Sequence, residues 1–103
     1  MLGKRPVAKP EYHSRAATEY EDAYLRYRAR SIRVAADFRR EMRRVLTAIA
    51  KTPESFPALD DDYRYALLRR FPFMIVFQIQ PERVFVVAVA HTSRKPDYWR
   101  NRH

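Results

Sequence analysis

Arginine, histidine and tyrosine side chains in the second half of the chain are the residues best suited to chemistry. Arg69 lies on an expected strand, His91 directly follows the last one, and Tyr98 lies in a basic–aromatic tail. Arginine can clamp a phosphate and stabilise transition-state charge, and histidine can move a proton near neutral pH. If the strands are neighbours, such side chains converge on one sheet edge. Together they would be the smallest set of side chains needed for metal-free RNA cleavage, in which a ribose 2′-hydroxyl attacks the phosphate of the same nucleotide.

The same region offers further side chains that suit an anionic target, namely Arg64, Arg70, Arg94 and Trp99. Structural roles compete with these functional ones. His91 shares a predicted strand face with Phe85, Val87 and Val89, where a packed, hydrogen-bonded histidine fits equally well. Arg64 can pair with the carboxylates of Asp60–Asp62 and simply hold a loop.

Other kinds of site lack the residues they need. The chain has no cysteine, which excludes disulfides and thiolate metal sites. Gly3 is the only glycine, so a glycine-rich phosphate loop is excluded. The histidines His13, His91 and His103 lack the paired spacing of a metal site, and no serine lies in a nucleophile-elbow motif. We expect neither a metal nor a cofactor.

The first half of the chain predicts a helical hairpin. Val7–Tyr12 is compatible with a short edge strand, and a helix begins at Ser14 with Glu19 placed away from its apolar face. Ser31 is the expected N-cap of a second helix, which Pro53 ends. The apolar stripe of that helix consists of Ala35, Phe38, Met42, Val45 and Ile49.

The second half predicts three strands, over Tyr63–Arg70, Phe73–Ile79 and Val84–Ala90. Gln80–Arg83 forms the turn of a hairpin, with Pro81 setting φ. The last two strands are apolar on both faces, so neither face is left to water. Because the helical hairpin covers only one face, the other requires the tail with Tyr98 and Trp99, or a partner protein.

Composition and charge bound the class of protein. We expect a single domain over residues 1–103, with a loose basic start over 1–6 and a basic–aromatic tail over 92–103. The net charge of +9 favours a polyanion or an acidic protein as partner. No apolar run reaches the ~18 residues of a membrane span, and residues 1–13 lack the apolar stretch of a signal peptide. A cytoplasmic location is therefore expected.

The order of these elements and several short motifs resemble the RelE/ParE superfamily of toxins from bacterial type II toxin–antitoxin systems. The resemblance runs from about Tyr12 to Arg102 and is greatest for the ParE branch. It rests on residues that are weak signals singly but specific in this order: Ala16, Glu19, Tyr20, Ala23, Ala36, Phe38, Pro53, Phe56, Pro57, Arg64, Ala66, Leu67, Phe71–Phe73, Ile75, Phe77, Val87–His91, Arg94, Pro96, Tyr98 and Trp99.

The resemblance implies an α+β fold in the order β-α-α-β-β-β, with a helical hairpin packed on one face of a small, largely antiparallel sheet. It also implies a toxin that inhibits DNA gyrase and is neutralised by a cognate antitoxin. The residues expected to contact the target or the antitoxin are Arg64, Arg69, Arg70, His91, Arg94, Tyr98 and Trp99.

Two alternatives stay open within the same superfamily. RelE-type members cut mRNA on the ribosome, and Arg69, His91 and Tyr98 would then be catalytic. However, Thr52–Tyr63 contains no lysine or arginine and Tyr98 is set back from the C-terminus, which favours a ParE-type protein that is not an enzyme. The other alternative is a decayed or purely regulatory member that binds its antitoxin and modulates operator DNA binding without harming the cell.

Overall fold

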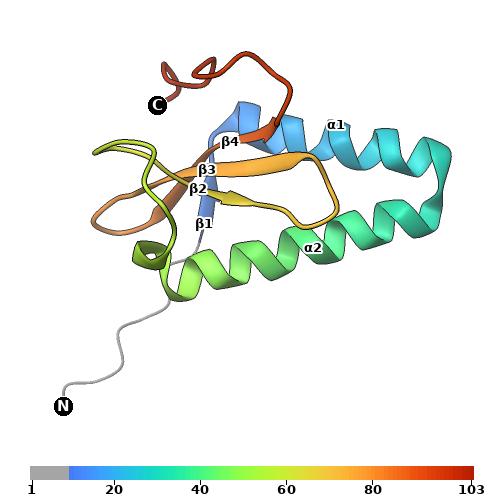
Figure 1. The fold of residues 1–103 in the computed structure, drawn as a ribbon, viewed down its shortest axis with the longest axis horizontal. Helices are drawn as coiled ribbons and strands as arrows, with labels where there is room; N and C mark the ends of the chain where they lie inside the picture. The colour runs from blue at the N-terminus through green and yellow to red at the C-terminus, as the bar shows by residue number, and fades with distance from the viewer. Residues whose placement is uncertain (1–9) are drawn as a thin grey trace.

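Two long helices and a four-stranded sheet make up the computed structural model, which describes residues 10–103 (Figure 1). The order is β-α-α-β-β-β, as predicted. The elements are β1 (Pro10–Tyr12), α1 (Ser14–Arg30), α2 (Ile32–Lys51), the short 3-10 helix η1 (Pro53–Ser55), β2 (Arg64–Leu67), β3 (Phe73–Ile79) and β4 (Val84–His91). Of the predicted edge strand, Pro10–Tyr12 is confirmed, whereas Val7–Lys9 and the expected loose start over 1–6 lie outside the described residues.

Polar side chains set the limits of the two helices. His13 caps α1, because its Nδ1 accepts the backbone N–H of Arg15 at 3.0 Å. Ser31 ends α1 and caps α2, and its Oγ accepts the N–H of Val34 at 3.2 Å. The helices are therefore joined by one residue and fold back on each other as the predicted antiparallel hairpin (Figure 1).

The sheet has the order β1-β4-β3-β2, with β1 parallel to β4 and the other pairs antiparallel. β2 is shorter than the predicted Tyr63–Arg70. Leu68 already donates its N–H to the Phe73 carbonyl at 3.0 Å, and Arg70 has a φ of 69°, so the chain has turned by this point. β4 is one residue longer than predicted and includes His91.

The main core lies between the helical hairpin and one face of the sheet. The predicted stripe of α2 is buried there in full. Its centre is aromatic: the ring centroids of Phe38 and Phe73 are 5.5 Å apart, and Tyr27 lies 5.1 Å from Phe38. Neither helix within residues 10–103 combines the length and the apolar character that a bilayer crossing needs.

The C-terminal tail covers the second face of the sheet, turning back across it after β4 (Figure 1). Trp99 is only 1% exposed, and its ring contacts that of Tyr63 with 4.7 Å between centroids. The sheet residues of this second cluster are Val76, Phe85, Val87, Ala88 and Ala90. Of the two covers considered for this face, the tail is the one observed, so a partner protein is not required there.

A β-bulge in β4 changes which side chains face which layer. Val76 pairs with Ala88 and Phe77 with Val86, which leaves Val87 as an extra residue. Val87 and Ala88 therefore both face the tail, and the alternation is inverted beyond them. The prediction that His91 shares a face with Phe85, Val87 and Val89 was wrong for Phe85 and Val87 and holds for Val89. The His91 ring packs on Phe73 in the helix-side core, 5.2 Å between centroids.

Candidate functional site

Glu19 of α1 is the centre of a polar cluster that ties the tail to the rest of the molecule. Its Oε1 accepts hydrogen bonds from Arg102 Nη1 at 2.9 Å and from the Val89 N–H at 3.0 Å. Its Oε2 accepts from the Tyr98 hydroxyl at 2.6 Å and from Arg102 Nη2 at 3.0 Å. Arg102 is 8% exposed, so this pair is largely shielded from water. We call Glu19, Tyr98 and Arg102 the tail latch.

The tail latch satisfies a strand edge that has no neighbouring strand. Within residues 10–103, β1 pairs with β4 only as far as Val86, so no strand borders the backbone of Val87–His91 on that side. Arg102 Nη1 donates to the carbonyl of Val87 at 3.0 Å, and Glu19 accepts the N–H of Val89. Two side chains thus replace the missing strand, because buried backbone polar groups need partners.

Tyr98 and Arg94 are held against the same carboxylate. The guanidinium of Arg94 lies 3.8 Å from the centre of the Tyr98 ring and its Nη1 is 3.7 Å from Glu19 Oε2. Burial of the Tyr98 hydroxyl, reinforced by its hydrogen bond to Glu19, raises the pKa of Tyr98 well above its ordinary value. The hydroxyl therefore keeps its proton at neutral pH and donates a hydrogen bond to Glu19.

His91 lies at the end of β4 in a different environment. Its Nδ1 accepts the N–H of Ser93 at 3.1 Å and lies 2.7 Å from the Ser93 hydroxyl oxygen. With Nδ1 acting as an acceptor, the proton of the neutral ring is on Nε2. The ring lines a groove of about 340 Å³ against α1, together with Phe73, Tyr27, Arg26 and Arg30.

Arg69 and Arg70 lie in the turn between β2 and β3, above α2. Glu41 of α2 accepts the backbone N–H of Arg69 at 2.5 Å and is also held by both Nε and Nη2 of Arg44, at 2.7 and 2.8 Å. The hydrogen bond from Arg44 lowers the pKa of Glu41, so this carboxylate is charged. Arg70 approaches Asp37 on the same helix at 3.8 Å.

Arg64 has a structural role at the other end of β2. Its Nη1 donates to the carbonyls of Phe56 at 2.6 Å and Glu54 at 3.2 Å. The predicted pairing of Arg64 with Asp60–Asp62 was wrong: Asp60 is instead bound by Arg100 of the tail at 2.7 Å. Arg64 is occupied by loop carbonyls and Asp60 by a tail residue that the sequence did not connect to it.

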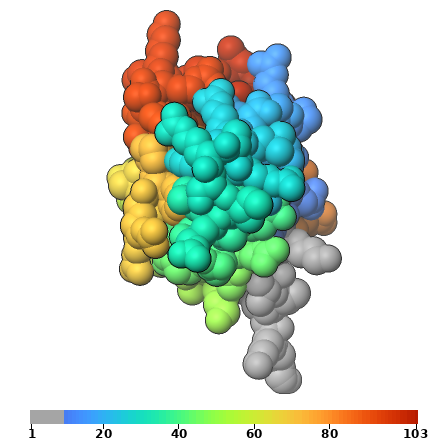
Figure 2. Space-filling view, turned by 90° about the vertical axis from the view of Figure 1, so that its right-hand side faces the viewer, coloured from blue at the N-terminus to red at the C-terminus, as the bar shows by residue number. Residues whose placement is uncertain are grey.

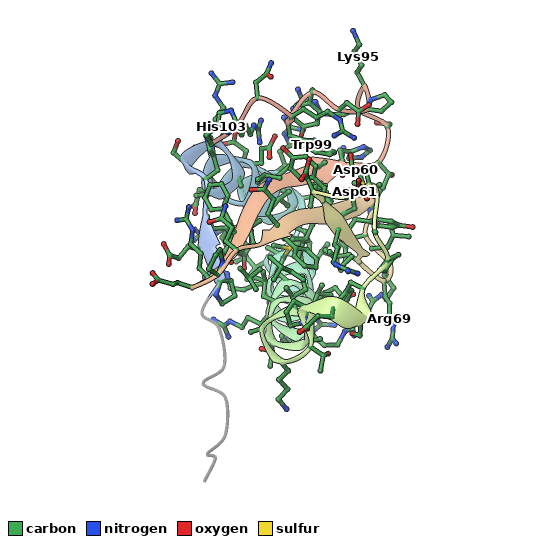
Figure 3. The ribbon with its side chains drawn as sticks, turned by 90° about the vertical axis from the view of Figure 1, so that its left-hand side faces the viewer. Asp60, Asp61, Arg69, Lys95, Trp99 and His103 are labelled. Atoms are coloured by element: carbon green, nitrogen blue, oxygen red, sulfur yellow. The ribbon has the colours of Figure 1, made fainter. Side chains whose placement is uncertain are left out.

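The predicted convergence of Arg69, His91 and Tyr98 is not observed. β3 lies between β2 and β4, so the strands that carry or precede these residues are not neighbours. Arg69 faces α2, His91 faces the C-terminal half of α1, and Tyr98 contacts Glu19 near the start of α1. Figure 3 shows Trp99 beside the Asp60–Asp61 loop and Arg69 away from both.

The functional residues that sequence reasoning missed are the acidic partners of the arginines and the C-terminal Arg102. The sequence prediction that Glu19 lies away from the apolar face of the first helix was wrong. Its helical spacing from the buried Ala16 and Ala23 puts it on that face, and this spacing could have identified it. Arg102 gave no such signal. Within residues 10–103, no three His, Asp or Glu side chains are arranged to hold a metal ion.

Comparison with known proteins adds the family. The family described as the ParE toxin of the type II toxin–antitoxin system, parDE, matches residues 11–96. Among solved structures, a chain of the chromosomal ParDE TA system from P. aeruginosa superposes with a TM-score of 0.70 at 14% sequence identity. The match covers 84% of this chain and 98% of that one. Comparison with curated protein sequences gave no significant match.

Proposed function

Because the chain belongs to the ParE toxin family of type II toxin–antitoxin systems, we propose that it inhibits DNA gyrase and is neutralised by a cognate antitoxin. In this proposal the protein binds its target and is not a hydrolase. The exposed cationic side chains near the sheet, Arg69, Arg70 and Arg94, are candidates for the contact surface. The net charge of +9 suits both an acidic antitoxin segment and a DNA-bound enzyme.

The observation that carries this choice over RNA cleavage is the separation of the three nuclease candidates. General acid–base catalysis needs proton donors and acceptors within hydrogen-bond reach of one reacting group. Tyr98 instead donates to Glu19 and has a raised pKa, which makes it a poor proton shuttle near neutral pH. His91 is engaged by Ser93, and Arg69 borders another groove.

The direct test is a gyrase supercoiling assay. The purified protein is incubated with gyrase, ATP and relaxed plasmid, and both supercoiling and linear cleaved DNA are followed. We expect loss of supercoiling together with trapped cleavage, and we expect His91→Ala to retain this effect to the extent that it folds. Normal supercoiling in the presence of a folded protein would contradict the proposal.

A ribosome assay in parallel tests the alternative on the same preparation. If the protein instead cuts mRNA in translating ribosomes, and Arg69→Ala or His91→Ala abolishes the cuts without unfolding the protein, the nuclease interpretation replaces ours. The antitoxin is tested by co-purification of the protein encoded beside this one. A stable complex that suppresses the gyrase effect is expected.

A further inference from the structure

A surface away from the tail latch gathers arginines around a groove. The groove lies between α2 and the β2–β3 turn and has a volume of about 290 Å³. Figure 2 shows this turn, coloured yellow to orange, running alongside the helical hairpin. We call the groove the arginine groove; its lining consists of Asp37, Arg40, Glu41, Arg44, Arg69, Arg70 and Phe71. We propose that the arginine groove binds the phosphodiester backbone of a nucleic acid.

The charge balance of the groove favours an anion. Four guanidinium groups face two carboxylates, which leaves two positive charges in excess. Glu41 is neutralised by Arg44, whereas Asp37 is contacted by Arg40 and more distantly by Arg70. The side chains of Arg40 and Arg70 remain 68% and 76% exposed. Each guanidinium has five N–H donors, so these two keep donors available to a ligand.

The backbone of Arg70 supports a role for its side chain. Its φ of 69° lies in the left-handed region, which glycine adopts freely and a residue with a Cβ adopts only at an energetic cost. The turn holds this conformation because Leu68 bonds to the Phe73 carbonyl and Glu41 binds the N–H of Arg69. Strain of this kind persists where the surrounding structure imposes it, and it clusters at ligand-binding and switch sites. Here it places an arginine at the rim of the groove.

The chemistry of the lining favours phosphates over an acidic peptide. All the cations that line the groove are arginines, whose planar donor fork matches phosphate and carboxylate oxygens alike, so the rest of the lining must distinguish the two ligands. Peptide grooves gain much of their affinity from apolar pockets, but Phe71 is the only apolar residue that lines this groove. Binding of nucleic acid by the arginine groove is independent of gyrase as the target, because nucleic acid is tested here without any enzyme.

The test is fluorescence anisotropy of the whole protein with a labelled DNA duplex and, separately, with a labelled single-stranded RNA, over a range of salt. Arg70→Gly removes the side chain at a position that glycine tolerates, so the variant should fold as well as the wild type. Loss of one phosphate contact lowers the slope of log K against log salt by about 0.9 for the duplex and about 0.7 for the single strand. Near 0.1 M salt this is about eightfold and about fivefold in affinity, respectively. Arg28→Ala on α1 is the matched control, because it removes one exposed arginine that does not line the groove.

We expect Arg70→Gly to bind the duplex about eightfold, or the single strand about fivefold, more weakly and Arg28→Ala to stay close to the wild type. Binding of DNA alone, or of RNA alone, identifies the source of the backbone. Three results would overturn the proposal: binding of neither nucleic acid, equal losses in the two variants, or displacement of the nucleic acid by an acidic peptide with unchanged affinity in Arg70→Gly. In the last two cases overall charge or another surface would be responsible.

Discussion

Replacing Glu19 by glutamine should release the tail latch, and we expect it to reduce the free energy of unfolding by about 3 kcal/mol. Removing one partner of a buried ion pair costs about 3–5 kcal/mol, because the other charge is left without compensation. Arg102 is 8% exposed and the Glu19 side chain 15%, so the pair is buried but not fully dry. Glutamine also keeps one acceptor oxygen, which places the expected cost at the lower end.

Urea denaturation followed by the fluorescence of Trp99, the only tryptophan, measures this loss. Glu21→Gln is the control, because Glu21 lies exposed on the same helix and its change should stay within about 0.5 kcal/mol. Adding Arg102→Met to Glu19→Gln removes the uncompensated charge and should recover part of the stability, but not all of it, because the Val87 carbonyl then loses its donor. If Glu19→Gln is as stable as Glu21→Gln, the latch does not hold the tail.

Three titrating groups give further expectations, each checked by measuring unfolding free energy against pH. The pKa of Glu41 is lowered by its hydrogen bond from Arg44, so its contribution to stability is present above pH 4.5 and is lost as pH falls through the folded pKa. Glu41→Gln should therefore reduce the loss of stability at acidic pH. Desolvation lowers the pKa of His13, whose neutral ring caps α1, so its contribution to stability is present above pH 6.5 and is lost as pH falls through the folded pKa. His13→Asn should keep a cap on α1 and remove this loss of stability on acidification. The pKa of Tyr98 is raised by burial, so its contribution is present below pH 10 and is lost as pH rises through the folded pKa; Tyr98→Phe should remove this alkaline loss.

Local patterns predicted the helices and the inner strands well. The apolar stripe of α2 has one period over its whole length, and Ser31 provides a capping hydroxyl at the start, so neighbouring residues alone determine this helix. β3 was predicted to the residue because an apolar run bounded by Pro72 and Pro81 leaves little choice of limits. The family resemblance placed the same elements in the right order.

The orientation of β4 beyond Val86 was not predictable from alternation. A run of apolar residues carries no mark that shows where one extra residue is inserted, because valine and alanine fit either face. The bulge at Val87 turns His91 towards the helices, and only the pairing with β3 reveals it. His91, four residues beyond Val87, was therefore assigned to the wrong face of the sheet.

The candidate site was less predictable than the fold because its contacts span the chain. Glu19 and Arg102 are 83 residues apart in sequence, and nothing in the sequence around Arg102 indicates that it is buried. The positions of Arg69 and Tyr98 likewise depend on strand order, which short motifs do not define. The residue types indicated that cationic and aromatic side chains form the candidate site, but they did not show which carboxylates bind those side chains.

The tail latch connects structure and function in a way that affects how variants are interpreted. Tyr98 and Arg94 are candidates for target contact, yet both are positioned by Glu19, which also completes the edge of β4. A large substitution at Tyr98 therefore disturbs the cover of the second sheet face before it tests any contact. Tyr98→Phe keeps the ring and removes only the hydroxyl, whereas Arg94, at 54% exposure, can be changed with little structural loss. A loss of toxicity in Arg94→Ala with unchanged unfolding free energy would thus indicate a contact, and the same loss in Glu19→Gln would indicate only a displaced tail.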